Sequence, residues 1–338
     1  MHQSPQQRQQ DEQKQKMNKL IDRIKGILLA GTAVMLSACS QLYHSKSAAE
    51  MQPSYIVVET NSERVLFAEN ANERRPIGML TNIATALVVM DWMRNENLSM
   101  DTLVTVPQAA CRWPASNMMQ LRPGDRISLR DALHSALMWD DSAAATTLAW
   151  ACGYSLAPQN PEMAFLDQMN KLAEAIGMKQ TTFKGVNGAV RSTSTARDLV
   201  LLGIYAIERP QVQNICAKTS YTANVINTMG PRPVQIINTN RLLASQGVDG
   251  VRSAGSGSAG YCVMASAKRG SVKAVNPTTG KQSTYAQRLL VIVLGMPSAS
   301  HRNNKAAALL RDGWEAWEIW QTTSDTSDPS KFIRLPKN

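Results

Sequence analysis

Residues 76–87 read Pro-Ile-Gly-Met-Leu-Thr-Asn-Ile-Ala-Thr-Ala-Leu, and two of them have a spacing that enzymes use for nucleophilic catalysis. Acyl transfer through a serine needs a hydroxyl nucleophile and a nearby group that takes its proton. A separation of three residues places two side chains on one face of a helix. Met79 and Asn82 have this separation, but a thioether has no proton to lose and an amide does not titrate. The segment therefore has the spacing of a catalytic helix but lacks the hydroxyl nucleophile and the base.

No replacement base is visible near this segment. There is no lysine between Lys46 and Lys171, and no serine in the chain is followed by a lysine three positions later. Thr81 has a hydroxyl, but two residues beyond Met79 it faces a different side of the helix. The sequence therefore predicts no catalytic residue in this segment.

Two further polar clusters could face the same pocket. The first is Asp140-Asp141-Ser142, whose carboxylates would repel a substrate carboxylate by about 1 to 4 kcal/mol at close range. It could equally be an acidic first turn that stabilises the helix after it. The second is Arg252-Ser253-Ala254. Arg252 could pair with a ligand carboxylate through two hydrogen bonds, and Ser253 adds a hydroxyl, so we expect these two residues to bind ligand.

The elements that would position these residues follow from local patterns. Residues 54–60 and 64–68 predict a β-hairpin, and residues 78–93 predict a buried helix. More helices are expected in the middle of the chain and strands again near the end. The helices are residues 129–138, 143–151, 161–176 and 195–208, with Ser128 and Ser194 as N-caps; the strands are 219–225, 234–238, 248–253, 261–267 and 288–294; and a closing helix spans 306–320.

This order predicts an α/β fold of the α+β kind. One antiparallel sheet would combine strands from both chain ends, with flanking helices and a helical subdomain.

Several short segments together resemble one known family. From residue 53 to 318 the chain is similar to the D-alanyl-D-alanine carboxypeptidases, penicillin-binding serine peptidases (S11) related to class A β-lactamases. The resemblance rests on 76–87, Leu121-Arg-Pro-Gly-Asp125, Gly177-Met178 with Thr181 and Phe183, Ser194-Thr-Ala-Arg-Asp198, Asn238-Thr-Asn240 and Asp249-Gly-Val251. It implies a β-lactamase/transpeptidase-like fold.

The resemblance also implies that all three catalytic motifs have changed. Met79 and Asn82 occupy the positions of the family's catalytic serine and lysine. Asp140, Asp141 and Ser142 occupy the positions of the family's Ser-x-Asn motif. The family's Lys-Thr-Gly motif corresponds to Arg252, Ser253 and Ala254. We therefore predict a catalytically inactive, envelope-located protein that binds or scaffolds at peptidoglycan or an envelope partner. The alternatives are an active hydrolase with a relocated nucleophile (Ser142, Ser253 or Cys111) and an accessory subunit of an envelope complex.

The N-terminal region contains a predicted targeting signal. Residues 1–16 look like a disordered extension, 17–38 like a lipoprotein signal peptide and 39–53 like a tether. Leu36-Ser-Ala-Cys39 resembles a lipobox, which implies a lipid on Cys39 and sorting to the outer membrane. The folded domain is expected at 54–320, followed by a disordered tail at 321–338.

Composition limits the possible partners. The net charge of +10 suits an anionic envelope polymer or membrane surface, but no basic run alternates with aromatic residues, so nucleic acid is not expected.

Four cysteines follow Cys39, and their spacing matches no metal motif. They are Cys111, Cys152, Cys216 and Cys262, and their disulfide pairing cannot be deduced from the sequence. We expect no metal and no cofactor.

Overall fold

The computed structural model describes residues 52–112, 116–275 and 282–323. The predicted extension, signal peptide, lipidation site at Cys39 and most of the tether lie outside the described residues, as does the predicted tail from residue 324 on.

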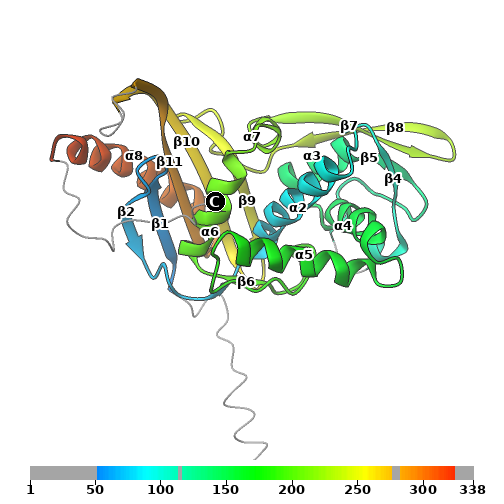
Figure 1. The fold of residues 1–338 in the computed structure, drawn as a ribbon. Helices are drawn as coiled ribbons and strands as arrows, with labels where there is room; N and C mark the ends of the chain where they lie inside the picture. Colours follow the sequence, from blue (N-terminus) through cyan, green and yellow to red (C-terminus); the bar gives the residue numbers. More distant parts are fainter. Residues whose placement is uncertain (1–51, 113–115, 276–281, 324–338) are drawn as a thin grey trace, which may run out of the picture. The chain divides into compact units, whose positions relative to one another are not determined.

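Five antiparallel strands from the two ends of the domain form the main sheet, in the order β2-β1-β11-β10-β9 (Figure 1). The strands are β1 (Ser54–Glu59), β2 (Arg64–Glu69), β9 (Val248–Ser256), β10 (Gly260–Val275) and β11 (Gln282–Met296). Ile56 of β1 pairs with Ile292 of β11. The sequence expectation of a sheet built from both chain ends is thus confirmed.

Alternating apolar residues give this sheet two buried faces. Val57 and Val291 pack in the cluster that includes Trp314 of α8 (Ala299–Thr323). Ile56 and Ile292 belong to the larger cluster shared with the other helices. Successive side chains of a strand point to opposite faces of the sheet. Because both faces are buried here, these strands have continuously apolar sequences.

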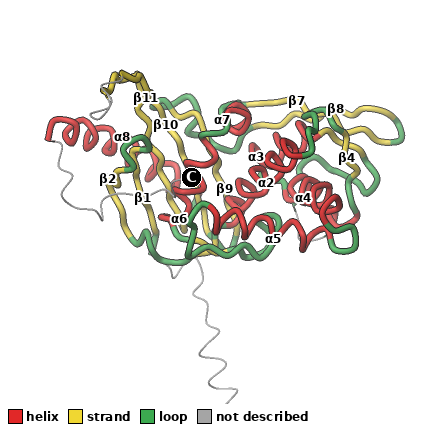
Figure 2. Tube along the Cα trace, in the orientation of Figure 1, coloured by secondary structure: helices red, strands yellow, loops and turns green. Residues whose placement is uncertain are grey.

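The remaining helices and short strands lie between β2 and β9 in the sequence. Figure 2 shows these helices in red and the strands in yellow. The helices are η1 (Gly78–Leu80), α2 (Thr81–Asn95), η2 (Gln108–Cys111), α3 (Leu129–Met138), α4 (Ser142–Leu156), α5 (Pro161–Ala175), α6 (Ala196–Ile207) and α7 (Pro210–Cys216). A second sheet has the order β4-β5-β7-β8, and a small third one pairs β3 with β6. Their strands are β3 (Arg75–Pro76), β4 (Leu103–Thr105), β5 (Arg126–Ser128), β6 (Thr193–Ser194), β7 (Ser220–Asn227) and β8 (Gly230–Ile237).

Helix starts follow ordinary capping chemistry. The Ser128 side chain accepts the backbone N–H of Asp131 at the start of α3, as the sequence predicted. At α6 the prediction was off by one residue, because the side chain of Thr195 accepts the N–H of Asp198 while Ser194 lies in β6. Gly203 lets α6 approach the main sheet closely, since a methyl group there would lie 2.6 Å from Leu290.

Three other properties concern the described part of the chain. Cys111, Cys152, Cys216 and Cys262 are free thiols. Among the described residues there is no group of three or more potential metal-ligating side chains. Nor does any helix in the described ranges have the length and hydropathy needed to cross a bilayer.

His134 is a buried histidine between α3 and β7. Its Nδ1 lies 2.7 Å from the carbonyl of Arg130, its Nε2 lies 3.1 Å from Lys218 Nζ, and its ring stacks on Tyr221. The carbonyl needs a donor and the ammonium needs an acceptor, which fixes the neutral tautomer protonated at Nδ1. Burial lowers the pKa of His134 to about 4, and Lys218 acts in the same direction.

This lowered pKa predicts a loss of stability in acid. In the unfolded chain the imidazole gains a proton below about pH 6.5, whereas in the folded chain it stays neutral until about pH 4. Compared with His134→Gln, the native protein should therefore lose up to about 3 kcal/mol of unfolding free energy as pH falls from 7 to 4. Urea unfolding of both proteins across this range measures the difference. If the difference in unfolding free energy between the two proteins did not change with pH, the lowered pKa of His134 would be contradicted.

Candidate functional site

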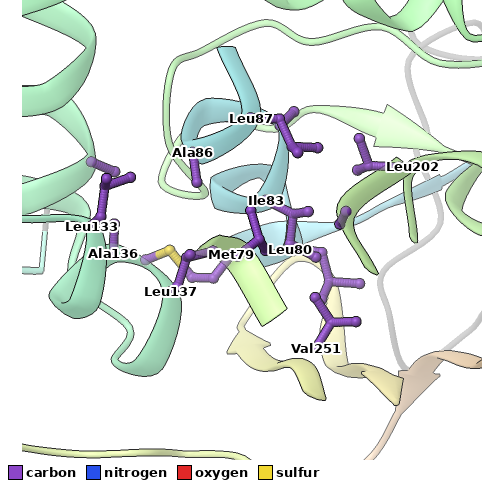
Figure 3. Packing of buried hydrophobic residues seen from close by; sticks show 14 of the residues in the cluster. Met79, Leu80, Ile83, Ala86, Leu87, Leu133, Ala136, Leu137, Leu202 and Val251 are labelled. Atoms are coloured by element: carbon purple, nitrogen blue, oxygen red, sulfur yellow. The ribbon is translucent and has the colours of Figure 1, made fainter. Parts of the chain in front are cut away.

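Met79 and Asn82 are both buried where α2 begins. Met79 lies in η1 with 7% of its surface exposed, among apolar residues that include Ala136 and Leu137 of α3 (Figure 3). Asn82 has no exposed surface, and its Nδ2 donates to the carbonyl of Ala136 at 3.1 Å. Its Oδ1 has no donor among the described residues. Neither side chain offers a nucleophile or a base.

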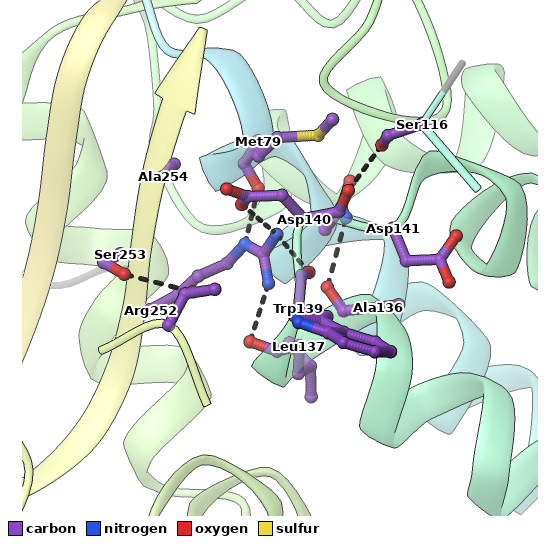
Figure 4. A network of polar contacts seen from close by, with 12 residues as sticks. Met79, Ser116, Ala136, Leu137, Trp139, Asp140, Asp141, Arg252, Ser253 and Ala254 are labelled. Atoms are coloured by element: carbon purple, nitrogen blue, oxygen red, sulfur yellow. Dashed lines mark hydrogen bonds and ion pairs between the residues drawn. The ribbon is translucent and has the colours of Figure 1, made fainter. Parts of the chain in front are cut away.

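Arg252 of β9 connects the positions of all three motifs (Figure 4). Its Nε donates to the carbonyl of Met79 at 2.8 Å. Its Nη1 donates to the carbonyl of Leu137 at 2.6 Å, and its Nη2 to that of Trp139 at 2.8 Å. The same Nη2 donates to Asp140 Oδ1 at 3.1 Å. The guanidinium group is completely buried and bonds entirely within the protein.

The acceptors explain why an arginine fits here. The final carbonyls of a helix have no partner within the helix and carry a partial negative charge. Leu137 and Trp139 lie at the end of α3, and the neighbouring carbonyl of Met138 accepts the N–H of Thr239. The planar fork of an arginine reaches several acceptors at once, which an ammonium group cannot do in the same geometry.

Asp140 lies beside two cations. Its carboxylate is 35% exposed and pairs with Arg252. The nearby Arg302, at the start of α8, is 5% exposed and donates through Nη1 to the carbonyl of Ala254 at 3.1 Å. Burial raises the pKa of Asp140, and both guanidinium groups oppose that shift. Burial likewise lowers the pKa of Arg252, against the effect of Asp140.

Sequence reasoning missed Arg302. It stands alone in a polar stretch at the start of the last helix, 48 residues after Ala254. No local pattern marks it, because its proximity to the site depends on α8 beginning beside the ends of β9 and β10. Only a residue-by-residue family comparison of the helix start could have indicated it.

Asp141 has a structural role. It is buried, and its carboxylate accepts the N–H of Ala144 at 3.0 Å and the hydroxyl of Ser135 at 2.8 Å. It also accepts the N–H of Met119 at 3.2 Å. Asp141 is the N-cap of α4, as the second interpretation of this acidic turn predicted. Of the two carboxylates, only Asp140 is placed to repel an anionic ligand.

Ser142 and Ser253 also bond within the protein. Ser142 Oγ lies 3.7 Å from Met79 Sδ and accepts a hydrogen bond from Ser116 Oγ at 3.1 Å. Ser253 is 1% exposed and donates to Thr239 Oγ1 at 3.1 Å. Ala254 is 2% exposed. Ligand binding by Arg252 and Ser253 stays a prediction, and it would require the present contacts to open.

The loop between α5 and β6 covers Met79 from the other side. A methyl group on Gly188 would lie 2.4 Å from Met79 Cα, so only glycine fits at this approach. Thr85 Oγ1 donates to the carbonyl of Val186 at 2.6 Å, and Asn187 Nδ2 donates to Thr146 Oγ1 at 2.7 Å. The backbone at Met79 is therefore held by this loop and by Arg252 together.

The residues proposed as relocated nucleophiles lack an adjacent base in the described structure. The Ser142 hydroxyl faces a thioether and another hydroxyl. The Cys111 thiol donates to the carbonyl of Leu121, and burial raises its pKa, which disfavours the reactive thiolate. The contacts of Ser142 and Cys111 serve packing and hydrogen bonding.

Comparison with known proteins decides the family. The family model described as D-alanyl-D-alanine carboxypeptidase matches residues 43–282. The chain belongs to the D-alanyl-D-alanine carboxypeptidase family. The carboxypeptidase DacF of Bacillus subtilis is 27% identical over 253 residues, which cover 74% of this chain and 62% of that protein. DacC of Escherichia coli is 30% identical over 273 residues, which cover 77% of this chain and 60% of DacC.

Solved structures agree with this family fold. The crystal structure of the Streptomyces K15 DD-transpeptidase superposes with a TM-score of 0.67 at 25% identity, covering 77% of this chain and 96% of that one. DacD of Francisella tularensis gives a TM-score of 0.64 at 22% identity, covering 80% and 75% of the two chains, and supports the fold alone. The chain spans about three fifths of the length of the carboxypeptidases DacF and DacC.

The contacts of Arg252 predict a large stability effect at this family site. Arg252→Met would leave the carbonyls of Met79, Leu137 and Trp139 without these donors and Asp140 without this partner. We expect a loss of about 3 to 5 kcal/mol in unfolding free energy, because three carbonyls would lose their donor. Asp140→Asn is the control and should cost less than about 1 kcal/mol, because the asparagine Oδ1 can still accept the hydrogen bond from Arg252 and the replaced carboxylate is partly exposed. Urea unfolding at pH 7 compares the variants, and equal losses would contradict a role for Arg252 beyond the ion pair.

Proposed function

We propose that this chain is a D-alanyl-D-alanine carboxypeptidase family member that does not perform the serine reaction and instead binds or scaffolds in the cell envelope. The observation that carries the proposal is the presence of Met79 and Asn82 at the positions of the family's catalytic serine and lysine. A buried thioether and an amide bonded to a backbone carbonyl stand where the family mechanism needs a nucleophile and a base. Loss of a nucleophile alone typically lowers turnover by about a million-fold.

The charged residues support the same proposal. Arg252 and Asp140 stand at the third and second motifs and pair with each other. An arginine bonded to three carbonyls and a carboxylate is a poor proton carrier, since a guanidinium group keeps its proton in proteins and its donors are occupied. A substrate carboxylate entering here would also meet Asp140.

The proposed location rests on the N-terminal sequence and on the family. A lipid on Cys39 would hold the domain near a membrane, and the net charge of +10 favours an anionic polymer nearby. The proposed ligand is peptidoglycan peptide or an envelope protein partner. Tethering would raise the local concentration of the domain, so a weak interaction could suffice.

Acylation by a fluorescent penicillin tests the loss of reaction. The purified full chain should show no covalent label on a denaturing gel, because no described side chain at the site combines a nucleophile with a base. Met79→Ser/Asn82→Lys should label slowly, since Asp140 and Arg252 still occupy the other motif positions. Adding Asp140→Ser and Arg252→Lys should raise the labelling rate at least about tenfold.

The variants separate the possible outcomes. Stoichiometric labelling of the native chain would overturn the proposal, and mass spectrometry of the labelled peptide would then identify a relocated nucleophile such as Ser142, Ser253 or Cys111. A carboxypeptidase of known activity in a parallel tube verifies the probe. Circular dichroism verifies that each variant is folded, so that absent label in a variant reports chemistry.

Lipidation of Cys39 is tested separately. Cells that express the native chain should incorporate labelled palmitate into it and retain it in the membrane fraction. Cys39→Ala should lose the label and move to the soluble fraction, because the lipid is the proposed anchor. Cys111→Ala is the matched control and should leave both results unchanged. Membrane retention of Cys39→Ala without palmitate would contradict the proposed anchor.

A further inference from the structure

Cationic side chains lie close together on the side of the domain where the described residues begin. At this point the carbonyl of Pro53 accepts a hydrogen bond from Asn70 Nδ2 at 3.1 Å. Arg197, in the first turn of α6, donates its N–H to the carbonyl of Ala71 at 3.0 Å and its Nε to Asn72 Oδ1 at 3.0 Å. The start of α6 is therefore bonded to the same turn that holds Pro53.

Three more cations lie on the segments beside this turn. Thr182 and Thr193 exchange two backbone hydrogen bonds, of 2.8 and 3.0 Å. Lys184 follows this pair by two residues and Arg191 precedes it by two, and both side chains are exposed. Arg74, which comes just after the turn, donates through Nη2 to the hydroxyls of Thr182 and Thr193 at 3.0 and 3.1 Å. We call the surface that carries Arg74, Lys184, Arg191 and Arg197 the entry face.

The exposed charge of the entry face is positive. Segments 70–75 and 180–198, which carry these cations, contain two acids. Glu73 Oε2 lies 2.8 Å from Nη2 of the buried Arg75, which offsets its charge. Asp198 is 6% exposed and accepts a backbone N–H and a hydroxyl of the preceding loop, both at 2.8 Å. The four cations therefore outnumber the acids that could neutralise them locally.

An exposed apolar side chain distinguishes the entry face from an ordinary basic patch. Val190 is 45% exposed and lies next to Arg191 in the sequence. It packs over Gly185, where a Cβ would lie 2.5 Å from Val190 Cβ, so the loop holds the valine at the surface. A soluble polyanion offers no apolar phase for such a side chain. A lipid surface offers anionic headgroups with an apolar layer beneath them, which suits cations that have an apolar neighbour.

We propose that the entry face lies against an anionic phospholipid surface. Each Lys or Arg close to such a surface strengthens binding by about fivefold. The proposed lipid on Cys39 precedes Gln52 by 13 residues, a length of chain that spans at most about 45 Å. A lipid at that position would hold the domain by the side on which the entry face lies. The inference rests on the proposed anchor for this orientation, whereas the cations and the valine belong to the domain itself.

Sedimentation with vesicles tests the inference in the absence of the lipid. The protein is residues 40–338, which contain the compact unit to which all described residues belong. It should sediment with phosphatidylcholine vesicles that contain about 30% phosphatidylglycerol, and at least about tenfold more weakly with pure phosphatidylcholine, because the anionic headgroups attract the face. Raising the salt concentration from about 0.05 to 0.5 M should weaken the binding, since the charges are exposed.

Charge reversal at the entry face provides a matched comparison. Lys184→Glu/Arg191→Glu should weaken vesicle binding at least about tenfold. Arg122→Glu/Arg126→Glu alters two exposed cations at β5, in another sheet, and changes the net charge by the same amount. This control should stay within about threefold of the native affinity, because its charges lie outside the face. Val190→Asn should weaken binding at least about threefold, because it removes exposed apolar surface. Circular dichroism verifies that each variant is folded.

The membrane proposal fails if the protein does not sediment with the anionic vesicles or binds neutral ones equally well. Equal losses in the two charge-reversal variants would also overturn it, because net charge alone would then explain the binding. If purified peptidoglycan retains the protein in a Lys184-dependent way and vesicles do not, the face is a polymer site instead. Palmitate labelling of Cys39 and penicillin labelling report separately on the anchor and on the serine reaction, so failure of either is distinguishable from failure of this inference.

Discussion

The buried guanidinium of Arg252 is the interaction on which the central part of this fold depends. Through one side chain, β9 is bonded to the carbonyls at the start of α2 and at the end of α3, and to the residue that precedes the cap of α4. A charge without exposed surface is tolerated only when hydrogen bonds replace its water. Here carbonyl groups and one carboxylate provide them, so the sheet and the helical subdomain share a single polar centre.

This centre explains how the family fold is held together with Met79 and Asn82 at two of the motif positions. In an active serine enzyme, a hydroxyl nucleophile and an adjacent base must be able to exchange a proton. In this chain these positions are filled by packing and by hydrogen bonds, although the Oδ1 of Asn82 has no donor among the described residues. Met79 joins the apolar cluster of α2 and α3, and Asp141 caps a helix.

Much of the fold could be predicted from the sequence. Apolar periodicity and caps located β1, β2 and α3 closely, because these signals are local. The prediction shortened β10 and β11, whose outer ends are polar and gain stability only by pairing with each other. It also missed α7, a short helix. At the site, the sequence led us to expect that Arg252 binds a ligand. Its hydrogen bonds to carbonyls could not be predicted, because those carbonyls belong to segments distant in the sequence.

The Asp140–Arg252 pair has a consequence for substitutions at these two positions. Changing Arg252 to lysine would remove the fork that joins three carbonyls, and changing Asp140 to serine would leave a buried cation with one partner fewer. Each substitution alone would therefore cost stability. Because the two residues share one hydrogen-bonded network, the identity of the residue at one position constrains which residues the other position tolerates.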